Sequence, residues 1–174
     1  MDQPLTNAPP APLQLRPPLH LVSPRATWYW FARALVGWVV LAVLQVALIV
    51  VVTQGDQLGL HLAALAATAV VAAAHLVVMP RWRYAVHRWE VTPAAVYTQA
   101  GWFSQQRRIA PISRIQTVDT ARGPLEQLFS LANVTVTTAS AAGPLKIHGL
   151  DRDLAQSVVD QLTHATEATR GDAT

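Results

Sequence analysis

Histidines and carboxylates are the residues of this sequence that could carry acid–base or metal chemistry, and their spacing favours neither. The six histidines form no H-x-x-x-H or H-E-x-x-H pair. They are His20, His61, His75, His87, His148 and His164. Asp160 and His164 have the i, i+4 spacing of an exposed helical pair. Cysteine is absent, which removes disulfides and thiolate sites, and glycine-rich phosphate loops and nucleophile elbows are missing. We therefore predict a protein that is not an enzyme and uses no cofactor or metal.

Two long uncharged runs dominate the first half of the chain. Residues 34–55 and 57–80 would each extend about 33–36 Å as helices, enough to cross a hydrocarbon core of about 30 Å. Only 13% of the 174 residues are charged, whereas about a quarter is usual in soluble domains. The alternative, a helical hairpin buried in a soluble core, would show a polar stripe that these runs lack. We predict a two-helix transmembrane hairpin over residues 28–80 and no cleaved signal peptide.

The residues that flank the two runs predict their orientation. The intervening turn, QGDQ, carries one acid and no base, whereas arginines cluster on the other side of both runs. Positively charged flanks stay in the cytoplasm, and aromatic residues such as the WYWF stretch gather at the membrane interface. We therefore expect a multi-pass membrane protein with both termini in the cytoplasm.

A few polar and small residues interrupt the apolar runs. Gln45 lies near the middle of the first run and is expected to hydrogen-bond to a neighbouring helix. His61 and His75 lie within about five residues of an interface, where a neutral imidazole is tolerated, so a proton pathway is not favoured. Small residues recur every four positions from Gly59 to Ala67 and predict the face that packs against the first helix, with self-association as the alternative.

The rest of the chain divides into a proline-rich start and a strand-rich end. Seven of the twelve prolines lie in the first 24 residues, which predicts a disordered cytoplasmic tail over residues 1–27. From residue 81 onward, short runs of β-branched and aromatic residues alternate with turn residues. They predict strands at 83–91, 95–100, 102–109, 114–120, 132–139 and 144–148.

The last apolar pattern has a helical period. Asp151 is a suitable N-cap for a helix whose apolar face includes Leu150, Leu154, Val158 and Leu162. Antiparallel strands closed by one C-terminal helix indicate a small sandwich or barrel with the helix at one end. We expect this domain over residues 81–166, followed by a disordered tail over residues 167–174.

Three short runs within this domain resemble a known family. They are IAPISRIQTV from Ile109, RGPLEQLFSLA from Arg122 and IHGL from Ile147. Together with the hairpin, they resemble the YdbS-like bacterial membrane proteins, which carry a bacterial pleckstrin-homology (PH) domain, over about residues 28–165. The resemblance implies a bent seven-stranded antiparallel sheet capped by a helix, a place in the bacterial cytoplasmic membrane, and a larger PH-domain relative as partner. The chain departs from the usual pattern at Arg122, Gln127 and Ser130.

One helical turn interrupts the predicted strands. Leu125, Leu128 and Phe129 recur at i, i+3 and i+4, after Gly123, which has the backbone freedom for an unusual turn, and after Pro124, which suits a first helical position. The favoured interpretation is a lid that plugs the open end of the sheet core. The alternative is an exposed contact with another copy of the domain.

The charges of this domain bear on its partners. From residue 81 the chain holds ten basic and eight acidic residues, a balance that argues against nucleic-acid binding. Several arginines are placed to meet an anionic leaflet. These candidate lipid contacts are Arg81, Arg83, Arg88, Arg107, Arg108 and Arg122. We therefore predict a membrane-tethered protein-interaction module, either a homo-oligomer or part of a complex with a larger PH-domain protein. The alternative is a module that senses anionic membrane lipids.

Overall fold

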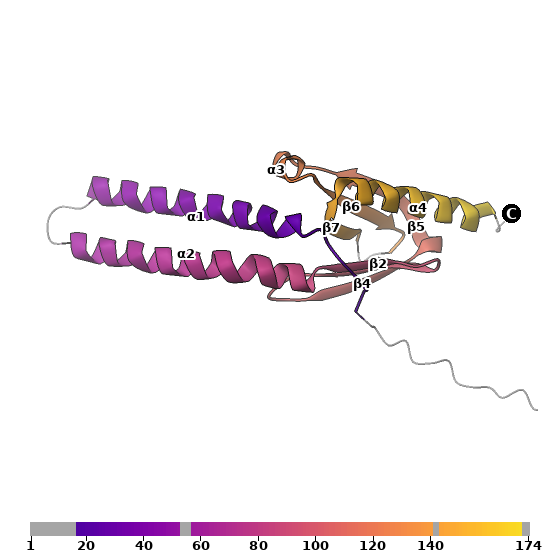
Figure 1. Cartoon of the computed structure of the whole chain (residues 1–174), viewed down its shortest axis with the longest axis horizontal. Helices are drawn as coiled ribbons and strands as arrows, with labels where there is room; N and C mark the ends of the chain where they lie inside the picture. The colour runs from indigo at the N-terminus through magenta and orange to yellow at the C-terminus, as the bar shows by residue number, and fades with distance from the viewer. Residues whose placement is uncertain (1–16, 53–56, 141–142, 172–174) are drawn as a thin grey trace, which may run out of the picture.

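A helical hairpin projects from one end of a β-rich domain (Figure 1). This computed structural model describes residues 17–52, 57–140 and 143–171. In chain order the elements are β1 (His20–Leu21), α1 (Arg25–Val52), α2 (Leu58–Val86), β2 (Arg88–Val91), β3 (Ala95–Ala100), β4 (Gln106–Pro111), the 3-10 helix η1 (Ile112–Arg114), β5 (Ile115–Ala121), α3 (Pro124–Leu128), β6 (Leu131–Thr138), β7 (Leu145–Asp151) and α4 (Arg152–Gly171).

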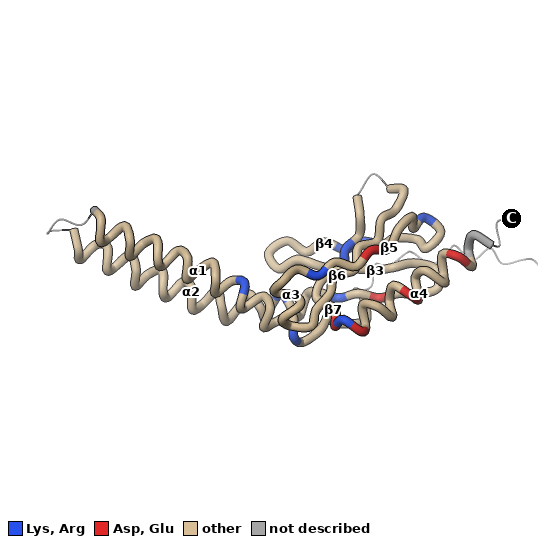
Figure 2. The backbone as a smooth tube through the Cα atoms, turned by 90° about the horizontal axis from the view of Figure 1, so that it is seen from above, with Lys and Arg blue, Asp and Glu red and all other residues tan. Residues whose placement is uncertain are grey.

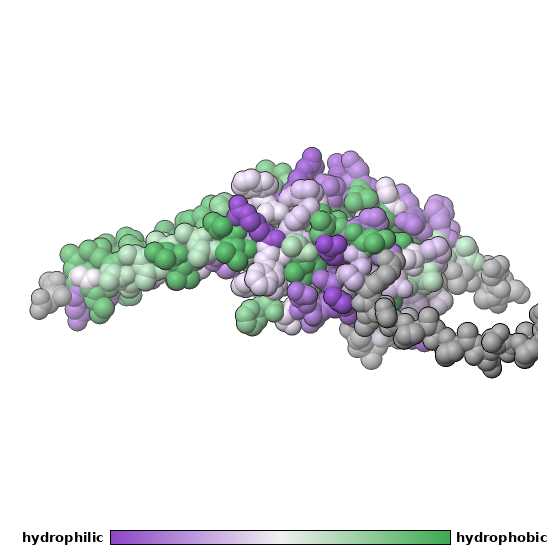
Figure 3. Space-filling view, turned by 60° about the horizontal axis from the view of Figure 1, so that its bottom comes forward, coloured by the Kyte–Doolittle hydropathy of each residue, from purple (hydrophilic) through white to green (hydrophobic). Residues whose placement is uncertain are grey.

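The two long helices form the predicted transmembrane hairpin. Both are long and apolar enough to cross a membrane, and their most apolar windows are almost wholly unburied within the chain. Figure 3 shows a continuous hydrophobic surface along the hairpin, in contrast to the mixed surface of the domain. Such a surface needs lipid around it. Gln45 Nε2 donates to Thr68 Oγ1 across the hairpin at 2.9 Å, which confirms the hydrogen bond expected of Gln45.

The small-residue stripe of α2 does not make the helix–helix contact, so that prediction was wrong. Gly59 is exposed, and a Cβ added there would meet nothing within 4 Å. The face toward α1 instead includes the partly buried Leu65, Thr68 and Ala72. Hydrogen-bonding side chains on this face, including Thr68, join the helices, and the stripe is turned outward.

Helix α2 continues through Pro80 to Val86. The boundary expected at residue 80, and the strand expected from residue 83, were therefore wrong at this point, because β2 begins only at Arg88. A proline within a helix removes one backbone donor, a loss that membrane helices tolerate when neighbouring groups compensate. The last turns of α2 therefore carry the helix from the membrane into the domain.

The domain holds two antiparallel sheets, of strand order β1-β2-β3-β4 and β5-β6-β7. Seven strands and a C-terminal helix agree with the expected fold class. Helix α4 packs against η1 and the second sheet, with Val158 and Leu162 buried in the core. Leu154 is 39% exposed, and Ala155 is buried instead.

Strand β1 comes from the segment that precedes the hairpin. His20 pairs with Trp89 and Leu21 with Arg88, so β1 is an edge strand beside β2. Val22 and Ser23 are buried. The predicted disordered tail over 1–27 therefore differs from the structure from residue 17 onward, because this stretch completes the first sheet. Residues 1–16 lie outside the described part.

Three further boundaries differ from those predicted. Residues 102–105 form a loop rather than the start of a strand, because Gly101 turns the chain at φ +116°. Helix α4 runs to Gly171, so the disordered tail expected from residue 167 is helical as far as that residue, and residues 172–174 lie outside the description. Asp151 ends β7, and its carboxylate accepts from Ser23 Oγ at 2.8 Å and from Arg25 at 3.5 Å rather than capping α4.

Candidate functional site

The first turn of α1 rests directly on β7. Ser23 N donates to Gly149 O at 2.9 Å, and Gly149 has a left-handed φ of +74°. A Cβ added at Gly149 would lie 2.9 Å from Ala26 Cβ, closer than ordinary packing of carbon atoms allows. Glycine is therefore required here, both for its backbone angle and for the close approach of α1.

Aromatic and basic side chains fill the space between the two helices and the domain. Trp30 is only 2% exposed. The Arg83 guanidinium lies 4.8 Å from the centre of the Trp30 ring, and the His87 ring lies 4.9 Å from it. His87 Nδ1 also lies 2.7 Å from the carbonyl of Arg83. Burial lowers the pKa of His87 to about 4, so its ring is neutral at pH 7.

A small, partly open cavity of about 150 Å³ lies beside this stack. It lies where the charge-free stretches of the hairpin end, which is where we expect the membrane surface. Its polar lining comes from α1, α2, α3, β6 and β7. The lining residues are Tyr29, Trp30, Arg33, Arg83, Glu126, Leu131, Asn133, His148 and Gly149. We refer to it below as the junction cavity.

The carboxylate of Glu126 is held at the wall of the junction cavity by three donors. Tyr29 Oη donates to it at 3.2 Å, Asn133 Nδ2 at 2.6 Å and Gly123 N at 2.5 Å. Burial alone would raise the pKa of Glu126, but these hydrogen bonds outweigh it and lower the pKa. Glu126 is therefore ionised at neutral pH, and its charge is stabilised by donors other than arginine.

His148 is the histidine that lines the cavity. Burial, followed by repulsion from Arg83 and Lys146, lowers its pKa. His148 is neutral, and the carboxylate of Glu126 already accepts hydrogen bonds from three donors. The guanidinium groups of Arg33 and Arg83 are therefore the main charged groups left on the cavity wall. Neither Arg33 nor Arg83 forms an ion pair within the described ranges. Arginine offers up to five N–H donors in a geometry that suits phosphate and carboxylate groups. The cavity is thus equipped to accept an anion.

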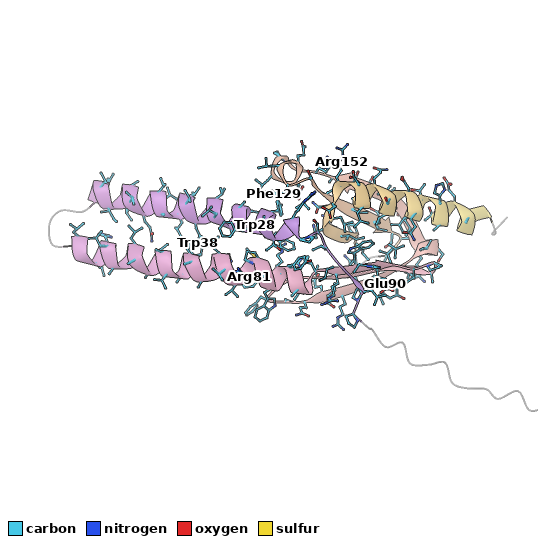
Figure 4. The ribbon with its side chains drawn as sticks, viewed as in Figure 1. Trp28, Trp38, Arg81, Glu90, Phe129 and Arg152 are labelled. Carbon is cyan, nitrogen blue, oxygen red and sulfur yellow. The ribbon has the colours of Figure 1, made fainter. Side chains whose placement is uncertain are left out.

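Helix α3 itself is more exposed than the plug that we expected, although Phe129, which follows it, packs against the hydrophobic core. None of its residues is fully buried, and Leu128 is 76% exposed. Phe129 is half-buried, and its ring lies 6.4 Å from that of Tyr29 on α1. Figure 4 labels Phe129 next to α3. The turn therefore braces the hairpin from the side. Gly123 precedes it with φ −74°, which any residue can adopt, so the expected backbone role of this glycine was wrong.

The six candidate lipid contacts lie in separate places. Arg83 lines the junction cavity, and Arg81 donates to the Val77 carbonyl on the outer side of α2 at 2.8 Å. Arg88 on β2 and Arg107 on β4 are both register partners of Gln99 on β3, so these two arginines lie on either side of Gln99 in the first sheet. The other two act within the fold. Arg108 donates to the carbonyls of Gly143 and Pro144 at 2.6 and 2.5 Å, and Arg122 donates to that of Leu131 at 2.9 Å.

Charge is distributed unevenly along the molecule. Figure 2 shows basic residues from the base of the hairpin onward and acidic residues only in the domain, several of them along α4. Two acidic residues of the domain lie close to the hairpin: Glu126, which lines the junction cavity, and Asp151, which contacts Arg25 at the start of α1. An anionic leaflet would meet a basic end of the domain.

An apolar groove of about 350 Å³ runs between the two helices on the outside of the junction. Its lining includes Phe31, Leu76 and Pro80, and Arg81 lies at its edge. Trp28, near the start of α1, lines the same groove, and Figure 4 shows its label and that of Arg81 near the domain end of the hairpin. The guanidinium group of Arg81 therefore lies beside an apolar groove.

Arg33 and His148 were not among the sequence-based site candidates. Arg33 stands out in the sequence only as the last charge before the first apolar run, a position that also fits a role in topology. His148 is 115 residues further on, and only the close approach of β7 to α1 brings it to the same cavity. Across the described ranges, no group of three or more His, Asp or Glu side chains has the arrangement of a metal site.

Comparisons with known proteins point to one family. The family described as bacterial PH domain matches residues 31–166. The UPF0699 transmembrane protein YdbS of Bacillus subtilis (strain 168) is 33% identical over 95 residues, which cover 55% of this chain and 58% of that protein. No solved structure matches the chain.

Proposed function

Because this chain belongs to the bacterial PH domain family, we propose that it is a membrane-tethered PH-like module that binds the phosphate-bearing headgroup of an anionic lipid in its junction cavity. The cytoplasmic leaflet is the rich source of such lipids. The proposal therefore includes the orientation expected from the sequence, with the domain on the cytoplasmic side.

The observation that carries this proposal is the pair of arginines in one cavity at the membrane surface. Arg33 and Arg83 line the same 150 Å³ space, and neither has a carboxylate partner in the described part of the chain. The two guanidinium groups repel each other, and an anion bound between them would offset this repulsion. A phosphate group supplies that anion and accepts several hydrogen bonds at once.

The test measures thermal stability of the full-length protein in detergent with added phosphatidylglycerol or phosphatidylcholine. A ligand that binds only the folded state stabilises it, by about 2.7 kcal/mol at 100 times its Kd. We expect phosphatidylglycerol to raise Tm and phosphatidylcholine to have little effect. Arg33→Gln should abolish the difference, whereas Arg114→Gln, the same charge change in η1, should preserve it. Equal stabilisation by both lipids, or an unchanged response of Arg33→Gln, refutes the proposal.

A protein-interaction role is the second candidate, and one observation favours it. Leu128 is 76% exposed on α3, beside the hairpin. A second copy of the chain, or a larger PH-domain membrane protein, would cover it. Leu128→Ser should then reduce the size of the complex in detergent while Tm of the monomer stays unchanged. Ile109→Ser, at another exposed apolar position on β4, is the control. A complex that keeps its size in Leu128→Ser excludes α3 as the contact.

A further inference from the structure

The loop between β3 and β4, residues 101–105, carries two aromatic side chains that the domain does not bury. Trp102 is 40% exposed and Phe103 is 92% exposed. Their rings lie 6.2 Å apart in an edge contact. We call residues 101–105 the aromatic loop. None of its five residues is charged: the sequence is GWFSQ.

The aromatic loop lies against α2 within the apolar run. The Trp102 ring is 5.9 Å from the ring of His75, and His75 Nδ1 accepts a hydrogen bond from Trp38 Nε1 at 3.0 Å. His75 precedes Arg81 by six residues, which amounts to about 9 Å of helix toward the membrane interior. In Figures 1 and 2 the turn at this end of the first sheet reaches back toward the hairpin. Trp102 is therefore deeper than the arginines that mark the membrane surface.

The residues next to the loop agree with this depth. Arg107 follows two residues after the loop ends and donates to Gln99 Oε1 at 3.0 Å, so charge returns as soon as the chain moves away from the hairpin. Trp is typical of the interface between headgroups and acyl chains. The exposed ring of Phe103 next to it gains free energy when lipid, rather than water, surrounds it.

Glycine at position 101 makes the turn of the loop possible. Gly101 has φ +116°, and an added Cβ would lie 1.9 Å from the carbonyl oxygen of Ser104. No other residue fits this conformation. The tight turn presents Trp102 and Phe103 together at the tip, where a wider loop would separate them.

We propose that the aromatic loop inserts into the membrane leaflet next to the domain, with Trp102 against α2 and Phe103 among the acyl chains. The loop is then a third point of attachment beside the two helices. It fixes the rotation of the domain about the hairpin axis, so the same face of the domain always meets the lipid surface. This inference does not depend on lipid binding in the junction cavity.

The absence of native cysteine allows a direct test in vesicles of phosphatidylcholine and phosphatidylglycerol. The full-length variants Phe103→Cys and Ser104→Cys are labelled with an environment-sensitive fluorophore, and Ser140→Cys, two residues beyond the end of β6, is the matched control. We expect blue-shifted emission and quenching by acyl-chain-brominated lipids at both loop positions, and water-like emission without quenching at residue 140.

The second position keeps the test decisive if Phe103→Cys folds poorly, because Ser104→Cys retains both aromatic rings. Water-like emission at both loop positions overturns the proposal. Blue-shifted emission without lipid quenching also overturns it, since the loop would then lie against protein; a disulfide between two copies of Phe103→Cys would identify that protein as a second copy.

Discussion

Replacing Gly149 with alanine tests whether α1 rests on β7 as closely as the structure indicates. The new residue must hold φ near +74°, and this left-handed conformation costs an L-residue about 1–2 kcal/mol. Its Cβ would also lie 2.9 Å from Ala26 Cβ, an overpacked contact that costs about 1–3 kcal/mol. We therefore expect Gly149→Ala to lower the free energy of unfolding by about 2–5 kcal/mol.

Gly143 provides a matched control for the backbone contribution. Its φ is +76°, and an added Cβ would meet nothing within 4 Å. Gly143→Ala should therefore cost only the conformational part, about 1–2 kcal/mol. The difference between the two variants measures the contact with α1. Denaturant titration of the full-length protein in detergent, followed by near-UV circular dichroism, gives both values.

A double variant separates the contact from any other effect at Gly149. Ala26→Gly removes the methyl group that the new side chain would strike, so Gly149→Ala should cost less in that background. We expect a coupling energy of about 0.5–3 kcal/mol, the range found for residues in contact. Equal costs for Gly149→Ala and Gly143→Ala, together with zero coupling to Ala26→Gly, would refute the close packing of α1 on β7.

Three further predictions concern the lid, the pH response and the orientation. Phe129→Ala should cost about 2 kcal/mol in the same titration, below the 3–5 kcal/mol of a fully buried phenylalanine, because the ring is half-buried; a loss above 4 kcal/mol would restore the plug interpretation. The pKa of His87 is about 4 when folded and near 6.5 when unfolded, so the unfolded chain binds more protons between these values. Stability should therefore fall by up to about 3 kcal/mol as pH drops from 6.5 to 4, and His87→Gln should flatten that part of the profile; an unchanged slope contradicts the assignment. In intact cells an impermeant maleimide should label Gln57→Cys and spare Ser140→Cys, and the reverse pattern would show that the domain faces outward.

The membrane hairpin and most strands were predictable because each is a local pattern. The run of uncharged residues predicted the spans, and the short run of β-branched and aromatic residues between turns predicted β3 at 95–100 with the same limits. Pro80 was misleading, since proline usually ends a helix, yet α2 continues to Val86. The lipid-exposed surroundings and the packing of Met79 and Val86 are tertiary influences that local propensity does not include.

The junction cavity was not predictable, because its parts are distant in sequence. Arg33, Arg83 and His148 meet only because α1, α2 and β7 converge. The same holds for β1, whose two residues show no strand pattern of their own and pair through the backbone with β2. Of the six arginines chosen as lipid contacts, only Arg83 lines the cavity. Position near an apolar run was a sound criterion, but it could not distinguish a side chain pointing into the junction from one bonded within the fold.

The origin of β1 has a consequence for biosynthesis. A ribosome completes β1 before the hairpin and β2 after it, and the two strands lie side by side in one sheet. They cannot meet if only one helix crosses the bilayer, because a single crossing would leave about 30 Å of hydrocarbon between them. Completion of the first sheet therefore excludes a chain with one failed crossing. A chain with one failed crossing would expose the edge of β2, the kind of unpaired strand that quality control and aggregation act on.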